Sequence, residues 1–405
     1  MKTQQTKLLP VKKLPKKLEN KRVPFLVSKH TRVRNDKASL IKERINNVKI
    51  YDKYYTEKST DCYNRLTGNN VRFSTLVHYT GGKAKFYTEV QKVWDFYVDQ
   101  SIIKQVLVPF LGGGSDMTNI SPKIMGRVYT MIVNDYNPVI CGLNINIRDN
   151  RDELKAAVQA IIDLDPITED DKKAFINLLQ EESQKIELTK DYNSIQLSAV
   201  YLVLQNISKN GIYEYDEKEG AGRYSTTTMK IENIKNCVKK IDFYGFFIDG
   251  YKNYIVENMS YDELIEKYGG EETFIVADPI YCEENHSEVP PEVLLKTSID
   301  YGFDFDHEKC LEVFTKRLKG SQIVYHNYFN TRLINEFKKC GFEHKAHVKN
   351  NISNNEDGTK KKCVEVIIYT NYRKKPLTLK ETAVEEIVMN NTEYQPMINP
   401  LVKVS

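Results

Sequence analysis

The sequence predicts an α/β fold with a largely parallel central sheet, and three short apolar runs carry that prediction. Each run is bounded by polar residues and is followed by glycine, an acid or an amide. Runs of this length suit strands that a parallel sheet buries on both faces. Ligands bind outside the carboxyl ends of such strands, so the residues that follow them are candidates for a functional site. The runs are residues 105–108, 128–133 and 274–277.

The last of these runs leads directly into Asp278-Pro279-Ile280-Tyr281. A carboxylate and the adjacent carbonyl can accept both hydrogens of an exocyclic amino group, while an aromatic ring stacks on the base that carries it. The nitrogen lone pair would then face a methyl donor, which is the arrangement that amino-methyltransferases use. The alternative is a plain Asp-Pro turn at the end of a strand.

The first run is followed by a glycine loop, residues 112–114, and then by a predicted helix. This order is typical of a first βα unit that cradles a phosphate or nucleotide. The spacing matches neither GxGxxG nor GxxxxGK[ST], so it supports neither a dinucleotide site nor a P-loop. Asp135, at the end of the second run, is well placed to hold ribose hydroxyls. Together these features indicate an adenosine-containing ligand; the alternative is a tight turn followed by an Asx-type helix cap.

A further glycine pair, Gly81-Gly82, stands before Lys83 and a helix predicted over residues 85–99. Paired glycines let backbone amides approach a ligand, although an ordinary turn has the same composition. Taken in order, the motifs resemble those of the Dam-type, D12-class DNA adenine-N6 methyltransferases over residues 77–375. The resemblance implies a Rossmann-like class I S-adenosylmethionine-dependent methyltransferase sheet with a small inserted, mostly helical DNA-recognition domain. The matching motifs are residues 79–83, 109–114, 134–137 and 278–281.

The resemblance also implies roles for individual residues. It assigns catalysis to Asp278, Pro279 and Tyr281, with S-adenosylmethionine as cofactor, double-stranded DNA as partner and no metal. The residues implied to bind the cofactor are Tyr79, Gly81, Gly82, Lys83, Pro109, Phe110, Gly112, Gly114, Asp135, Ser260, Tyr261 and Asp278. The residues implied to contact DNA are Lys83, Asn210, Tyr213, Arg223, Tyr301, Asn354, Lys361 and Lys362.

Four positions depart from the family pattern. Val108 replaces an acid that can pair with the methionine ammonium, and Ile280 replaces the second proline of the catalytic motif. Ser260 stands where an acid is common. Glu214 stands where an arginine is common in the DNA-contacting segment, so the sequence preference need not follow that of the family.

The chain divides into five predicted parts. Two helices are expected within the helical segment, and a long loop over residues 282–306 is expected to act as a lid. After that loop we expect a helix over 307–318, a strand over 322–326, a helix over 331–339 and a closing hairpin. The parts are a basic, partly disordered arm (1–70), a catalytic domain (71–150 and 250–375), a helical segment (151–209), a target-recognition region (210–249) and a tail (376–405).

Charge and composition agree with a nucleic-acid partner. Residues 1–50 carry 15 Lys and Arg against 3 acids, whereas the rest of the chain carries 44 basic and 52 acidic residues. A basic arm on a mildly acidic body suits a polyanion, or serves as a solvated leader. No apolar run is long enough to span a membrane. The seven cysteines form no CxxC pair, and the histidines have no metal-ligand spacing.

Several alternatives stay open at this stage. The same chemistry fits cytosine N4, an RNA substrate fits the basic arm, and Val108 and Ile280 are compatible with a catalytically weakened DNA-binding relative. We expect a monomer or weak dimer in the reducing cytoplasm of a bacterium or a phage-infected cell. The resemblance also suggests a place in a restriction–modification pair.

Overall fold

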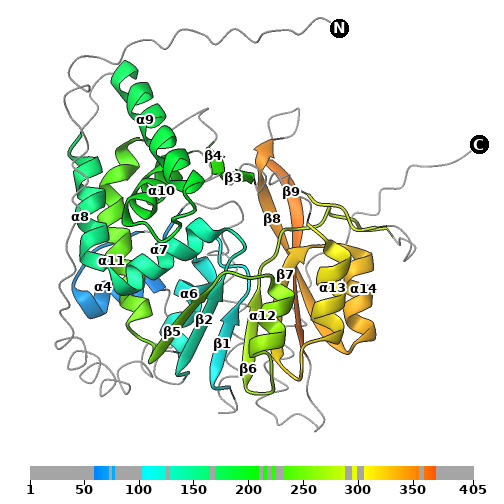
Figure 1. The fold of residues 1–405 in the computed structure, drawn as a ribbon. Helices are drawn as coiled ribbons and strands as arrows, with labels where there is room; N and C mark the ends of the chain where they lie inside the picture. The colour runs from blue at the N-terminus through cyan, green and yellow to red at the C-terminus, as the bar shows by residue number, and fades with distance from the viewer. Residues whose placement is uncertain are drawn as a thin grey trace, which may run out of the picture.

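The computed structural model is built around a seven-stranded sheet in the order β5-β2-β1-β6-β7-β9-β8 (Figure 1). The first five strands in this order are parallel to one another, and β9 is antiparallel to both of its neighbours. The predicted α/β class and mostly parallel sheet are therefore confirmed. The strands are β1 (Gln105–Val108), β2 (Thr130–Asn134), β5 (Asn253–Glu257), β6 (Thr273–Ala277), β7 (Gln322–Tyr328), β8 (Phe342–Asn354) and β9 (Lys360–Thr370).

Part of the chain lies outside the described structure, including most of the predicted arm and the whole predicted tail. The predicted helix over residues 85–99 and two parts of the predicted lid, residues 288–293 and 299–304, also lie outside it. The described residues are 59–72, 75–77, 103–124, 128–164, 169–208, 213–216, 221–224, 231–287, 294–298, 305–354 and 360–370.

Helices cover both faces of the sheet and enclose two hydrophobic cores (Figure 1). One core receives side chains from α6, α7, α10 and α11, and the other receives them from α12, α13 and α14. Among the described residues, no helix is long and apolar enough to cross a membrane. The helices are α4 (Ser59–Thr67), α6 (Ser115–Ile124), α7 (Pro138–Asp149), α8 (Arg151–Ile162), α9 (Glu169–Leu188), α10 (Ile195–Ile207), α11 (Cys237–Ile248), α12 (Tyr261–Tyr268), α13 (His307–Lys316) and α14 (Thr331–Lys339), with a 3-10 turn η1 (Ile231–Asn236).

The central strands supply both cores because successive side chains of a strand point to opposite faces. In β1, Val106 and Val108 enter the first core, whereas Leu107 enters the second. In β6, Phe274 enters the first core and Ile275 the second. All five residues of β6 are buried. This burial explains why these strands read as continuous apolar runs in the sequence.

Polar residues at the strand ends start the helices that follow. The Asn137 side chain accepts a hydrogen bond from the Val139 amide at 2.9 Å, and Pro138 occupies the first turn of α7. Asp306 caps α13 in the same way, and Asn330 caps α14. Such caps satisfy amides that a helix leaves unbonded and contribute about 1 kcal/mol each. The predicted helices at 307–318 and 331–339 and the closing hairpin are confirmed.

The inserted region, residues 151–249, contains two mostly buried helices, α10 and α11, and a small hairpin. The two predicted helices of the helical segment are α8 and α9, and α10 is buried on nearly every side. Within the predicted recognition region, α11 also packs into the first core, which buries Phe243, Tyr244 and Phe247 completely. The hairpin of β3 (Tyr213–Asp216) and β4 (Ala221–Tyr224) forms a separate two-stranded sheet. In Figure 1 it lies beyond the carboxyl ends of the parallel strands.

Candidate active site

Strands β1 and β6 are neighbours in the sheet, and the strand order reverses between them. The chain proceeds from β1 to β2 and β5 on one side, and from β6 to β7 on the other. At such a reversal the two connections leave in opposite directions, and the carboxyl ends of the strands border a ligand crevice. The glycine loop follows β1 and Asp278 follows β6, so two motifs from distant parts of the sequence meet at one edge.

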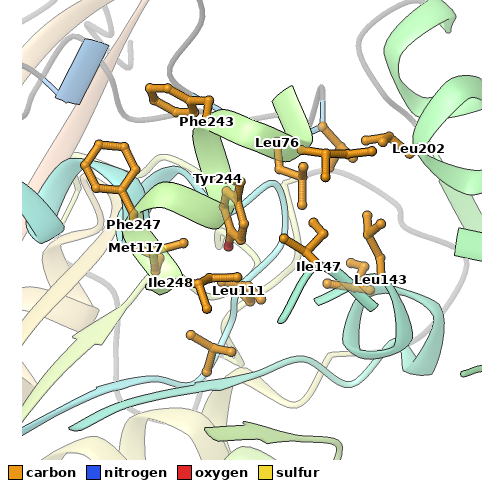
Figure 2. Close-up of a cluster of buried hydrophobic side chains, with 14 of the residues drawn as sticks. Leu76, Leu111, Met117, Leu143, Ile147, Leu202, Phe243, Tyr244, Phe247 and Ile248 are labelled. Atoms are coloured by element: carbon orange, nitrogen blue, oxygen red, sulfur yellow. The ribbon is translucent and has the colours of Figure 1, made fainter. Parts of the chain in front are cut away.

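The glycine loop turns sharply and packs closely against α11. Gly112 and Gly114 have φ angles of +48° and +74°, which side chains rarely adopt. A Cβ atom on residue 114 would lie 2.5 Å from the ring of Tyr244, closer than van der Waals contact allows. Figure 2 shows Tyr244 in the core with Leu111 and Met117. Glycine is therefore required at position 114 both by the backbone and by the buried ring behind it.

Asp135 organises the loop from the neighbouring strand. Its Oδ2 atom accepts the Gly112 amide at 2.8 Å, and its Oδ1 atom accepts the Asn137 amide at 2.9 Å. Burial raises the pKa of the Asp135 carboxyl to about 6, although these hydrogen bonds oppose the shift. Each carboxylate oxygen can accept more than one hydrogen bond, so these contacts leave capacity for ligand hydroxyls. Asp135 therefore stabilises the turn and the start of α7, and it can still accept hydrogen bonds from a ligand.

Asn134 joins the carboxyl ends of three strands. Its amide group donates to the carbonyls of Pro109 and Met259 at 2.9 and 3.1 Å, and its oxygen accepts the Met259 amide at 3.0 Å. The Asn134 carbonyl also accepts the Leu111 amide at 2.9 Å. This buried side chain therefore sets the spacing between the glycine loop and the segment after β5.

Aromatic rings form one wall of the edge. Phe110 and Tyr261 have ring centroids 5.4 Å apart, and Phe305 lies 6.1 Å from Phe110 and 6.0 Å from Tyr261. Phe314 lies 6.2 Å from both Phe110 and Tyr261. The rings come from the glycine loop, the start of α12 and the region of α13. Phe110, Tyr261 and Phe305 are partly exposed and offer an apolar surface for a planar ligand, whereas Phe314 is fully buried.

The Asp278 motif follows β6, which pairs with β1 on the side away from β2. Asp278 and Tyr281 are partly exposed, and Pro279 is buried between them. The Tyr281 ring meets the Tyr328 ring edge to face, with centroids 4.8 Å apart and planes at 76°. Burial raises the pKa of the Tyr281 phenol, and the Asp278 carboxylate raises it further. Tyr281 is therefore a neutral aromatic surface beside a carboxylate.

A short antiparallel pairing holds the backbone of this motif in place. The Tyr281 carbonyl accepts the Ser298 amide at 2.8 Å, and the Cys282 amide donates to the Asn327 side chain at 3.0 Å. The returning segment, residues 294–298, is fixed in turn by Glu308, which accepts the Leu295 amide at 2.9 Å.

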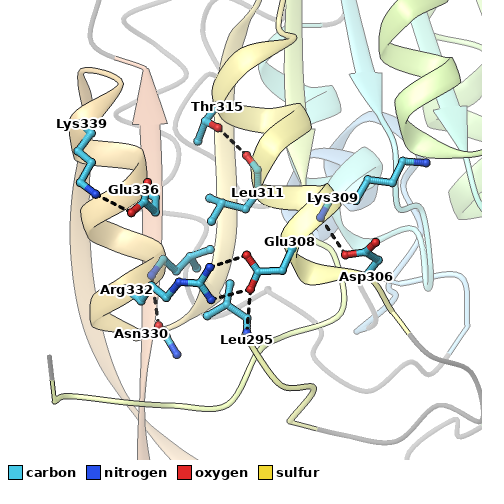
Figure 3. Close-up of polar contacts among 11 residues, drawn as sticks. Leu295, Asp306, Glu308, Lys309, Leu311, Thr315, Asn330, Arg332, Glu336 and Lys339 are labelled. Carbon is cyan, nitrogen blue, oxygen red and sulfur yellow. Dashed lines mark hydrogen bonds and ion pairs between the residues drawn. The ribbon is translucent and has the colours of Figure 1, made fainter. Parts of the chain in front are cut away.

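Glu308 also forms a two-pronged ion pair with Arg332 of α14, with distances of 2.6 and 2.5 Å (Figure 3). Arg332 is only 9% exposed. The loop that carries the Asp278 motif is thus connected through residues 294–298 to α13 and α14.

Comparison with known proteins identifies the family. The sequence model of the D12 class N6 adenine-specific DNA methyltransferases matches residues 79–355. The chain belongs to this family. It is also similar to the Type II methyltransferase M.MjaIII of Methanocaldococcus jannaschii, with 21% identity over 305 residues that cover 73% of this chain and 98% of the relative. The predicted family, enzyme class and reaction are confirmed: this D12-class enzyme methylates adenine N6 of DNA at specific sites.

The structure brings together ten of the predicted catalytic and cofactor-binding residues of this D12-class methyltransferase. Their individual roles stay predictions. Ser260 begins α12, where its hydroxyl donates to the Glu263 carboxylate at 2.8 Å, so part of its hydrogen-bonding capacity serves the helix start. The ten residues are Pro109, Phe110, Gly112, Gly114, Asp135, Ser260, Tyr261, Asp278, Pro279 and Tyr281.

The remaining predicted residues are distributed differently. Tyr213 and Arg223 belong to the β3–β4 hairpin, where Arg223 pairs in register with Glu214. Asn354 ends β8 and pairs with Lys360 at the start of β9, next to Lys361 and Lys362. These strands place five of the eight predicted DNA-contacting residues on two hairpins. Tyr79, Gly81, Gly82, Lys83, Asn210 and Tyr301 lie outside the described residues.

Two departures from the family pattern have clear positions. Val108 ends β1 and is fully buried in the first core, so the chain offers an apolar side chain where an acid is usual. Ile280 is partly buried between Pro279 and Tyr281.

No group of three or more His, Cys, Asp or Glu residues in the described part of the chain could hold a metal ion.

The sequence did not reveal the supporting roles of three residues. Asn134 belongs to the matching motif over residues 134–137, but its bridging role depends on β5, which is distant in the sequence. Tyr244 and Tyr328 gave no signal, because each reaches the site only through tertiary packing.

Proposed function

We propose that this methyltransferase uses S-adenosylmethionine as its methyl donor and acts on an adenine turned out of duplex DNA. The observation that carries the proposal is the convergence of the glycine loop, Asp135 and the Asp278 motif at one edge of the sheet. A phosphate-free nucleoside ligand needs hydrogen-bond acceptors for its hydroxyls and an apolar surface for its base. Asp135 and the Phe110–Tyr261 pair offer both.

The fit of the donor rests on features of the loop itself. The positive φ angles of Gly112 and Gly114 let the chain turn sharply after β1, and the Gly112 amide is thereby bonded to Asp135 at the edge of the sheet. S-adenosylmethionine supplies an electrophilic methyl group when it is bound. The carboxylate of Asp135 would accept the ribose hydroxyls, and the rings of Phe110 and Tyr261 would flank the adenine.

The catalytic roles follow from the chemistry of an aromatic amine. The N6 lone pair of adenine is delocalised into the ring and is a weak nucleophile. Asp278 and the Pro279 carbonyl would accept the two amino hydrogens, which concentrates electron density on the nitrogen and directs its lone pair. Tyr281 would stack on the extruded base, and the proton released from N6 would leave by way of Asp278.

Binding of the donor provides a direct test through Asp135. Because burial raises the pKa of Asp135 to about 6, we expect S-adenosylmethionine affinity to fall as the pH drops below 6, by up to about tenfold per pH unit. Above that pH the carboxylate is ionised and accepts the ribose hydroxyls. Asp135→Asn should bind the donor more weakly at pH 7.5 and should show a flatter pH profile.

Isothermal titration calorimetry between pH 5 and 8, with the folded state checked by circular dichroism, measures both effects. Asp163→Asn is a matched control, because Asp163 is exposed at the end of α8, away from the site. Equal affinities for the wild-type protein and Asp135→Asn throughout this range would contradict the assigned role.

A further inference from the structure

A polar cavity of about 340 Å³ lies beside the inserted region, outside the site described above. It is bounded by the segment after α4, the C-terminal end of α10 and the corner between η1 and α11. Its volume falls in the range typical of ligand pockets. Its lining residues are Asn70, Val71, Arg72, Asn206, Asn233, Asn236, Lys239 and Lys240.

The chemistry of this lining favours an anion. Three of the described residues that line the cavity are cationic, four are asparagines and none is acidic. Arg72 and Lys239 are exposed, whereas Lys240 is only 3% exposed. The Lys240 ammonium donates to Asn206 Oδ1 at 2.5 Å. Like charges gathered in one cavity repel each other, and a bound anion would offset that repulsion.

The position of the lysines in their helix points the same way. Lys239 and Lys240 lie in the first turn of α11, which has no acidic residue in that turn. The positive end of a helix dipole disfavours cations and favours anions. Burial lowers the pKa of Lys240 to about 8, which still leaves the ammonium mostly charged at neutral pH. An anion in the cavity would offset the charge of both lysines.

The cavity lies where the chain leaves α10 for the β3–β4 hairpin and where it returns from the hairpin to η1. Asn206 is the second-last residue of α10, and η1 is the first helical turn after the β3–β4 hairpin. The Asn206 carbonyl accepts the Asn233 side-chain amide at 3.2 Å, which joins the two ends of that segment. Asn206 also donates to the Leu76 carbonyl at 3.3 Å, and the Leu76 amide donates to Gly113 of the glycine loop at 3.1 Å. A group held here is therefore linked to both the hairpin and the glycine loop.

We propose that this cavity binds a phosphate group and that, in the complex with substrate, the phosphate belongs to the DNA backbone. This inference rests on the assigned DNA methyltransferase activity. Contacts to backbone phosphates orient a protein on DNA without reading sequence. A phosphate held between the end of α10 and η1, which flank the β3–β4 hairpin in the chain, would fix the position of that hairpin relative to the glycine loop.

The test measures DNA affinity by fluorescence anisotropy over a series of KCl concentrations, without a methyl donor. Lys240→Met and Arg72→Gln should each weaken binding by about tenfold at low salt and reduce the slope of log K against log [salt] by about 0.9. Arg72→Gln changes an exposed side chain, so it keeps the test informative if Lys240→Met folds poorly. Lys252→Met is the matched control, because Lys252 is exposed beyond the opposite end of α11 and does not line the cavity.

A second arm separates a DNA phosphate from a free one. Thermal unfolding is followed with added pyrophosphate at constant ionic strength, for the wild-type protein and for both cavity variants. If pyrophosphate stabilises only the wild-type protein while all DNA salt slopes are equal, the cavity binds free phosphate and the DNA assignment is overturned. If neither the slopes nor the unfolding temperatures distinguish the variants from Lys252→Met, the whole inference is overturned. Methylation by the wild-type enzyme, assayed in parallel, reports on the activity independently.

Discussion

Replacing Asp278 with alanine should lower kcat for DNA methylation by about a thousandfold or more, with a much smaller loss of S-adenosylmethionine affinity. The carboxylate is proposed to accept an amino hydrogen of adenine in the transition state, and loss of one such preorganised group typically costs two to three orders of magnitude or about 3–4 kcal/mol. The motif backbone should keep its position, because it is held by Ser298 and Asn327 through bonds that do not involve the Asp278 side chain.

Asp278→Asn makes the prediction sharper, because it keeps one acceptor oxygen but loses the negative charge. We expect its turnover to lie between those of the wild-type enzyme and Asp278→Ala. Single-turnover measurements with radiolabelled S-adenosylmethionine and excess enzyme would separate the chemical step from product release. Asp163→Ala, at an exposed position, should match the wild type. Turnover of Asp278→Ala within tenfold of the wild type would rule out this catalytic role.

Arg332→Ala should lower the free energy of unfolding by about 2–3 kcal/mol, the largest effect on stability that we expect outside the apolar cores. Arg332 is nearly buried, and its removal leaves the partly buried Glu308 carboxylate without its two-pronged partner. Glu308 also accepts the Leu295 amide, so residues 294–298 and the Tyr281 backbone should loosen as well. A decrease in kcat should therefore accompany the loss of stability.

Urea denaturation followed by circular dichroism measures the first effect, and methylation kinetics well below the unfolding midpoint measure the second. Lys339→Ala provides a matched control in the same helix, since Lys339 forms an exposed ion pair with Glu336 (Figure 3). That change should shift stability by less than about 0.5 kcal/mol. Equal effects of the two substitutions would show that the Arg332–Glu308 pair has no special role.

The features that could be predicted from the sequence are those that local patterns encode. β1 and β6 read as apolar runs because both of their faces are buried, and Asp135 and Asp278 follow strands directly. In a parallel sheet, such strand ends share one edge, so the order of motifs was enough to place them together. The caps on α7, α13 and α14 follow from Asn and Asp residues at the right positions.

The features that could not be predicted depend on contacts between distant segments. Nothing near Gly114 in the sequence indicates that Tyr244 of α11 fills the space behind it. Lys240 reads as a surface lysine in a basic stretch, yet the packing of α11 against α10 buries it and forms a cavity around it. The Tyr281–Tyr328 contact likewise depends on the pairing of β6 with β7.

The measurement that tests the central claim most directly is nucleoside mass spectrometry of unmethylated duplex DNA after incubation with the enzyme and S-adenosylmethionine. We expect N6-methyladenine as the product from the wild-type protein and from Asp163→Ala, and its absence with Asp278→Ala. N4-methylcytosine in place of N6-methyladenine would contradict the adenine specificity while retaining the amino-methylation chemistry. No methylated base from the wild-type protein, on duplex or single-stranded DNA, would contradict the account as a whole.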